Sequence, residues 1–280
     1  MNRPVVRRAL ATWIIGLGTL AAGLTVAPAA RASARELDPA HVVPLEQIAA
    51  ESRDSVAEVI RDNTFHRRGA PETFPCDARI YLALLNEPAL TLALWQDLSS
   101  SPVRLQQVGP NRYQGTDGAG ASAAWEFVYR SPKLHVLLGH LDYTSPRGNA
   151  HLQGRIVLIV HSGFYREVNG EPWVQHDVEA YVKIDSKGWK AVARTVRPVI
   201  ERLLDDQVRE AGWFVSLMGR LVLMYPSWAC QVVNQRPDLN SEVRRRFRAI
   251  VTQTRRPGAS SGRPVVVDNS TSNPDATLRR

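Results

Sequence analysis

The chain has 280 residues, and 44% of them are hydrophobic, a share that is ordinary for a globular protein and too high for a disordered one. This length is enough for one large domain or two small ones. The formal net charge of +8 comes mostly from the two ends of the chain, so the basic balance says little about the folded middle.

Residues 1–34 have the pattern of an export signal. Met1–Arg8 is basic, Ala9–Val26 is apolar, and small residues at 27–29 or 32–34 offer cleavage sites. We therefore expect an exported protein, either periplasmic or extracellular. The alternative is an uncleaved segment that anchors the chain in a membrane, because the apolar run is just long enough to span a bilayer.

The segment 35–75 predicts one modest helix followed by a linker. Apolar residues recur at helical spacing among charged ones, at Ile48, Val56, Val59 and Ile60. Because charged residues surround them, we expect this helix to pack loosely or to act as a spacer. His66–Pro71 contains Gly and Pro and is interpreted as the linker.

Residues 77–98 predict two short helices that meet near Asn86–Pro88. Each half has its own apolar face, and Pro88 suits the first position of the second helix. The apolar positions are Ile80, Leu84 and Leu85, then Leu90, Leu94, Trp95 and Leu98.

The pattern changes to period two over residues 103–184, which predicts an antiparallel sheet of about six strands. Asn169-Gly170 is a good two-residue hairpin turn. The last strand separates into an apolar face and a polar face, so we expect one buried and one solvated side of the sheet. The apolar face carries Val174, His176, Val178, Ala180, Val182 and Ile184.

A long amphipathic helix is predicted from Gly188 to about Tyr225, where apolar residues recur every three or four positions. Pro198 lies inside this pattern, so the helix kinks or restarts there, and Pro226 ends it. The domain then closes near Val233. Residues 234–280 predict a basic, largely disordered tail, within which Glu242–Thr254 can form a basic helix.

Two short helices, an antiparallel meander and a long final helix occur in the order found in one known fold. This α+β order, with Asn169-Gly170 before the last strand and Gly188-Trp189 at the start of the long helix, resembles the helix-grip fold of the START and Bet v 1 superfamily, also called SRPBCC or polyketide cyclase-like. The resemblance covers residues 76–233. Pro198 departs from the plainest form of that fold.

The resemblance implies a cavity for an apolar molecule between the sheet and the long helix. Its walls would include Val178, Val182 and Ile184 from the last strand, together with Val192, Val196, Ile200 and Leu203 from the helix. The alternative is that the same side chains fill the core completely.

Signals for catalysis or metal binding are weak, and we assign no catalytic residue, metal or cofactor. His176 is polar on an apolar strand face, so it either contacts a ligand, as an acid–base group or hydrogen-bond partner, or is a core histidine paired with a neighbour. Arg155 either offers a cation to an acidic head group or is a solvated strand residue. Cys76 and Cys230 form a disulfide, which export would permit, or stay two separate thiols.

Three functions follow from this interpretation. The first is an exported, non-enzymatic carrier or sensor of a lipid or other hydrophobic small molecule. The second is a cyclase or hydrolase that uses the same cavity, with His176 as its acid–base group. The third is a structural module of the cell envelope. The Arg-rich tail either only keeps the chain soluble or meets an anionic membrane surface or a cell-envelope polymer. Nucleic acid is not expected as its partner, because export removes the protein from nucleic acid.

Overall fold

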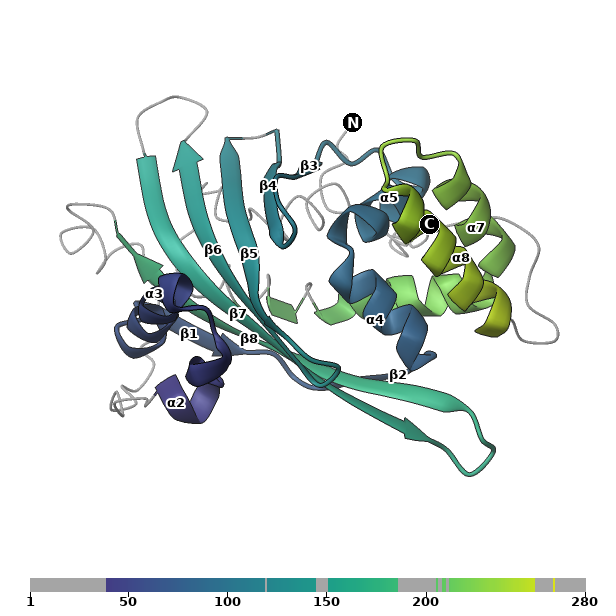
Figure 1. The fold of residues 1–280 in the computed structure, drawn as a ribbon, viewed down its shortest axis with the longest axis horizontal. Helices are drawn as coiled ribbons and strands as arrows, with labels where there is room; N and C mark the ends of the chain where they lie inside the picture. The colour runs from purple at the N-terminus through teal and green to yellow at the C-terminus, as the bar shows by residue number, and fades with distance from the viewer. Residues whose placement is uncertain are drawn as a thin grey trace, which may run out of the picture.

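The computed structural model describes residues 39–118, 120–144, 151–185, 205, 208–209, 212–254 and 264. The predicted signal segment and the helix predicted over 188–204 lie outside these ranges, together with Val192, Val196, Ile200 and Leu203. Within the described part, the chain forms a large antiparallel sheet with helices on both faces (Figure 1). The predicted α+β class is therefore confirmed.

The sheet has eight strands in the order β1-β8-β7-β6-β5-β4-β3, and β2 also pairs with β8. The six strands predicted over 103–184 are present, with bounds β3 Arg104–Gln107, β4 Arg112–Thr116, β5 Ala121–Arg130, β6 Leu134–Thr144, β7 His151–Arg166 and β8 Pro172–Ile184. All neighbouring strands run antiparallel. The hairpin turn lies at Asn169-Gly170 as predicted, with Gly170 at a φ of 81°. Its loop has three residues, 168–170, rather than two, because the Glu167 N–H donates to the Glu171 carbonyl and the Gly170 N–H to the Glu167 carbonyl.

Two further strands lie where the sequence predicted a linker. β1 (Phe65–Arg68) and β2 (Glu72–Pro75) pair with successive parts of β8. The linker predicted over His66–Pro71 is therefore wrong at residues 66–68, which belong to β1. The strands have four residues each, which is too short for a period-two pattern to show, and they are held by their pairing with β8 rather than by local preference.

Five helical segments pack on one face of the sheet, which we call the inner face and which carries Val174 and Val178. The two short helices predicted over 77–98 are confirmed as α4 (Ala78–Asn86), capped by the Asp77 carboxylate, and α5 (Pro88–Leu98). Residues 212–224 are helical and the helix ends before Pro226, as predicted. Then follow α7 (Pro226–Asn234) and α8 (Ser241–Thr254).

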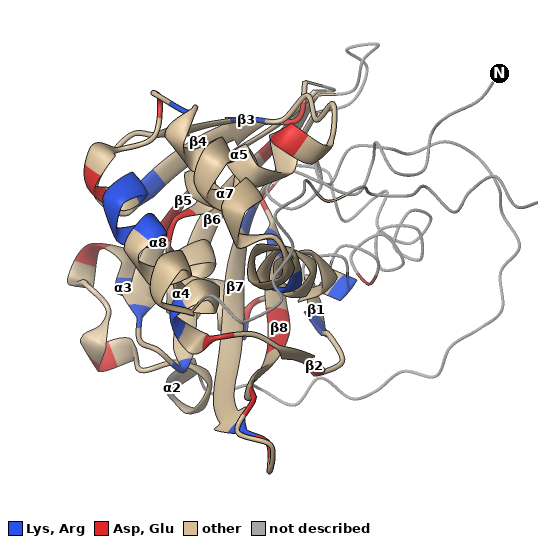
Figure 2. Cartoon of the chain, turned by 90° about the vertical axis from the view of Figure 1, so that its right-hand side faces the viewer, with Lys and Arg blue, Asp and Glu red and all other residues tan. Residues whose placement is uncertain are grey.

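α8 belongs to the folded body rather than to a tail. Phe247 and Val251 are 1% and 2% exposed and pack in the same core as α4 and α7. The Arg246 guanidinium donates to Glu87 at 2.7 Å, which ties α8 to the start of α5. The domain boundary expected near residue 233 therefore moves to about residue 254. Because Phe247 and Val251, four positions apart, face the core, the basic side of α8 faces outward and is blue in Figure 2.

The opposite face, which we call the outer face, is covered in part by the N-terminal segment. This segment forms α2 (Pro39–Val42), the short η1 (Leu45–Gln47) and α3 (Ala50–Arg61). α3 lies against the long strands in Figure 1, and its Val56, Val59 and Ile60 are fully buried. A loosely packed spacer and a wholly solvated outer face were both predicted, and both predictions are wrong. In the described ranges no helix is long and apolar enough to cross a membrane.

Candidate functional site

The inner face of the sheet carries the residues predicted to line a cavity on β8. Val178, Val182 and Ile184 lie on this face and are 3%, 2% and 9% exposed. Arg155 does not join them, because its strand partner is Lys183 and it therefore points to the outer face. The part of the predicted wall that the long helix would supply lies outside the described residues.

Next to these buried residues, the two central strands present apolar side chains that stay half-buried. They are Leu137 and Leu141 on β6 and Leu152, Ile156 and Leu158 on β7. On the outer face of the same strands, Val136, Val157 and Ile159 are 0% exposed under α3. Central strands are normally the most buried part of a sheet, so this difference means that accessible apolar surface remains on the inner face.

Small residues and stacked aromatic rings continue this inner surface. Tyr113 and Trp125 stack with ring centroids 5.7 Å apart. Gly139 lies beside Trp125 on the neighbouring strand, and a Cβ atom there would come within 2.8 Å of the Ile156 side chain. A glycine therefore stands here because Ile156 approaches the backbone closely, and no side chain projects from the inner face at this position. We call the surface formed by Leu137, Leu141, Leu152, Ile156 and Leu158 the inner wall.

His176 also lies on the inner face, but it is enclosed in the core. Its Nδ1 atom is 3.3 Å from the Tyr81 hydroxyl, which in turn is 2.8 Å from Ser162 Oγ. The Phe74 ring packs edge-on against the imidazole at 5.2 Å. Burial lowers the pKa of His176 to about 4, although the backbone of Gly212 partly opposes this shift. The ring is therefore neutral at pH 7 and closed to solvent, which favours the paired core histidine over an acid–base group.

On the outer face, Arg155 joins α3 to the sheet. Its guanidinium contacts both Glu58 oxygens, at 2.6 and 3.2 Å, and both Asp185 oxygens, at 2.9 Å each. Hydrogen bonds from Arg155 and then Lys183 lower the pKa of Glu58 to about 2. The Arg155 guanidinium is thus paired with two carboxylates of this chain. It neither lies free in solvent nor is available to an acidic head group.

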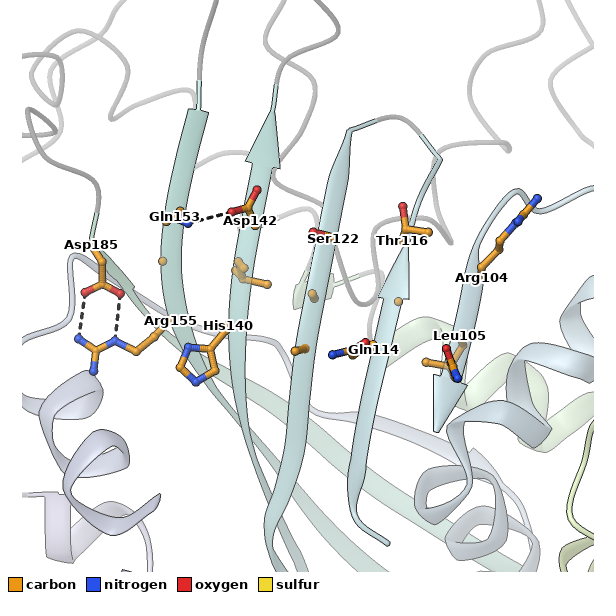
Figure 3. Close-up of a pocket in the computed structure, with 16 residues that line it drawn as sticks. Arg104, Leu105, Gln114, Thr116, Ser122, His140, Asp142, Gln153, Arg155 and Asp185 are labelled. Carbon is orange, nitrogen blue, oxygen red and sulfur yellow. Dashed lines mark hydrogen bonds and ion pairs between the residues drawn. The ribbon is translucent and has the colours of Figure 1, made fainter. Parts of the chain in front are cut away.

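A groove of about 1010 Å³, with polar and apolar lining residues, crosses the outer face beyond the end of α3 (Figure 3). Its lining residues come from the five adjacent strands β3 to β7, with Asp185 from the end of β8, and include Arg104, Gln114, Ser122, His140, Asp142, Gln153 and Arg155. Asp142 accepts hydrogen bonds from Gln153 at 2.9 Å and from His151 at 3.0 Å. Arg155 pairs with Asp185 at 2.9 Å, so both aspartates of the lining have partners within this chain.

A buried carboxylate on the outer face was missed from the sequence. Glu179, 7% exposed, receives hydrogen bonds from His66 at 2.6 Å and from Tyr181 at 2.7 Å, and His161 lies 3.6 Å away. Burial alone would raise the pKa of Glu179, but the nearby His161 imidazole and the hydrogen bonds from His66 and Tyr181 lower it well below its usual range. Sequence reasoning placed Glu179 on a solvated face, because β1 and α3 were not expected to cover it.

The described residues hold no group of three or more His, Cys, Asp or Glu side chains arranged to bind a metal ion. Cys76 is buried near Gly219, and Cys230 lies half-buried on α7. The disulfide between them stays a prediction. The inner wall is an apolar surface whose leucine and isoleucine side chains stay half-buried in the described part of the chain.

No family model and no curated protein matches this chain. Several solved structures are similar to it. A conserved protein from Geobacillus kaustophilus is 13% identical, over 55% of this chain and 96% of that chain, with a TM-score of 0.36. A START superfamily protein from Mycobacterium smegmatis is 8% identical, over 55% and 97% of the two chains, with a TM-score of 0.31.

The di-domain ARO/CYC protein BexL of the BE-7585A biosynthetic pathway is 14% identical, over 61% of this chain and 56% of that chain, with a TM-score of 0.34. The likeness concerns the fold alone. The helix-grip assignment itself rests on the strand order of this chain, with α4 and α5 before the meander and helices after it.

Proposed function

We propose that this chain binds an apolar small molecule or lipid against the inner wall, as an exported carrier or sensor without catalytic activity. The observation that supports the proposal is the half-buried state of Leu137, Leu141 and Ile156 in the middle of the sheet. Covering such surface contributes about 25 cal/mol per Å² of apolar area, so an apolar ligand gains most of its affinity from this contact.

The polar groups near the inner face do not suggest a reaction. His176 is enclosed by Tyr81 and Phe74, and a substrate on the inner wall would meet leucine and isoleucine side chains instead. Export stays part of the proposal because of the basic and apolar pattern of residues 1–34. Secretion of a tagged full chain, with mass measurement of its N-terminus, tests that part separately.

The binding proposal is tested by native mass spectrometry and by titration of a lipophilic fluorescent probe after delipidation. Replacing Leu141 by Trp keeps the wall apolar and fills the space in front of it, so we expect probe affinity to fall by about tenfold or more. The matched control is Val168→Trp, at a turn residue that is fully exposed. If the delipidated protein binds no probe, or if both variants bind it like the wild type, the proposal fails.

A further inference from the structure

The groove on the outer face is built from two rows of side chains that cross the strands (Figure 3). Cross-strand pairing forms the first row from Gln106, Gln114, Ala124, His140 and Arg155. The second row lies two residues away on each strand and consists of Arg104, Thr116, Ser122, Asp142 and Gln153. Each row runs from β3 to β7, which is a distance of about 19 Å at the usual spacing of strands.

Small side chains form the floor of this groove. Ser122 and Ala124 belong to β5, and they lie between longer side chains of β4 and β6, such as Gln114 and His140. A strand in the middle of a sheet usually carries β-branched or aromatic residues, and alanine is depleted there. Two short side chains at this place leave the backbone of β5 open from outside, which helps to produce the hollow of about 1010 Å³.

Several polar side chains of the rows take no part in holding the fold together. Within the described part of the chain, no side-chain hydrogen bond or ion pair is formed by Gln106, Gln114, Ser122 or His140. All of these residues are exposed. An amide, a hydroxyl and a neutral imidazole each donate and accept hydrogen bonds. They therefore match a ligand whose groups also both donate and accept, which is the property of a hydroxyl group.

The charges of the groove cancel, which points to a neutral ligand. The lining contains two arginines and two aspartates, so their formal charges sum to zero. Arg155 already pairs with Asp185, and Asp142 already accepts a hydrogen bond from Gln153. A polyanion such as a nucleic acid needs several cations along its length, whereas Arg104 stands at one end of its row. Peptide recognition normally uses a strand edge or an apolar groove, and the rows cross the strands instead.

We propose that the outer groove binds a neutral carbohydrate chain that lies across β3 to β7. Hydroxyl groups of the sugar units bond to Gln114, Ser122 and His140, and the C–H face of a sugar ring lies on the methyl group of Ala124. The groove lies on the outer face and the inner wall on the other side of the same strands, so this site does not depend on the apolar ligand proposed above.

Calorimetric titration of the full-length chain with neutral hexasaccharides tests the proposal. The probes are cellohexaose, maltohexaose and chitohexaose, which differ in linkage and in the substituent at one ring carbon. We expect at least one of them to bind with a Kd below about 1 mM. The Kd should be the same in low and in high salt, because a neutral ligand forms no ion pair with the groove. Heparin, as a polyanion, should bind less tightly than that sugar.

Matched substitutions assign the binding to the groove. Gln114→Ala should raise the Kd about fivefold, because it removes one hydrogen-bonding group. Gln175→Ala, at an exposed glutamine of β8 outside the groove, should leave the Kd unchanged. Ser122→Leu raises the floor and should raise the Kd by about tenfold or more. All three residues are exposed, so the urea midpoints of the variants should equal that of the wild type.

The imidazole of His140 reports the contact directly by nuclear magnetic resonance. Its ring signals, identified by their absence from His140→Gln, should shift when the bound hexasaccharide is added. His135 lies on the inner face and is 1% exposed, so its ring signals should stay in place and serve as the reference.

The proposal is overturned if none of the three hexasaccharides binds, or if the His140 signals do not move when one of them does. Equal Kd values for Gln114→Ala and Gln175→Ala would place the sugar elsewhere on the chain. Binding of heparin alone, lost in high salt, would make the groove a site for polyanions instead. The lipophilic probe of the inner wall should bind Ser122→Leu like the wild type, so failure of either proposal is seen independently of the other.

Discussion

The enclosed imidazole of His176 predicts a loss of stability in mild acid. Burial lowers its pKa from 6.5 to about 4. The unfolded chain therefore binds the proton more tightly than the folded chain, so this contribution to stability is present above pH 6.5 and is lost as the pH falls towards 4. At pH 5, protonation of one such histidine lowers the free energy of unfolding by about 2 kcal/mol relative to pH 8.

The perturbation that isolates this effect is His176→Gln, which removes the titrating group and keeps a polar side chain beside Tyr81. Urea unfolding of the wild type and the variant at pH 8 and pH 5 gives the four free energies that are needed. We expect the wild type to lose about 2 kcal/mol more than the variant between the two pH values. The same pH dependence in both proteins would refute the assignment of His176 as a buried neutral residue. A second buried histidine, His135, has a pKa lowered to about 4 by burial and by Arg130, and it remains in both proteins.

Two substitutions test elements whose packing the sequence did not predict. Ile60 on α3 is 0% exposed, so Ile60→Ala should cost about 2–5 kcal/mol of unfolding free energy, whereas Val168→Ala at the exposed turn should change it by less than about 0.5 kcal/mol. Similar small effects from both would mean that α3 is a loose spacer after all. Phe247→Ala should lower the free energy of unfolding by about 3–5 kcal/mol in the same urea measurement, and Arg248→Ala, at an exposed residue, is its control. If the urea midpoint of Phe247→Ala is unchanged, α8 does not pack in the core and belongs to the tail.

The ion pairs of Arg155 hold the N-terminal helix α3 on the outer face of the sheet. A guanidinium held by Glu58 and Asp185 fixes α3 on the sheet, and the low pKa of Glu58 keeps this ion pair charged throughout the pH range of the experiments above. The N-terminal segment therefore covers the outer face independently of what the inner wall binds.

The sequence by itself determined most of the local structure. The alternation along β8, the Asn169-Gly170 turn and the break between α4 and α5 at Pro88 were all predictable, because each depends on residues that are neighbours in the chain. The order of these elements was also enough to indicate the helix-grip fold. The face on which Val178 and Val182 lie followed from the period of the strand.

Only the tertiary structure decided which polar and apolar faces are covered. β1 and β2 become strands because β8 offers them an edge, and α3 buries a face that looked solvated from its own residues. Glu179 is surrounded by His66 and His161, which lie 113 and 18 positions away along the chain. Periodicity reports which side of an element is apolar, but burial depends on what packs against that side, and those partners come from distant parts of the chain.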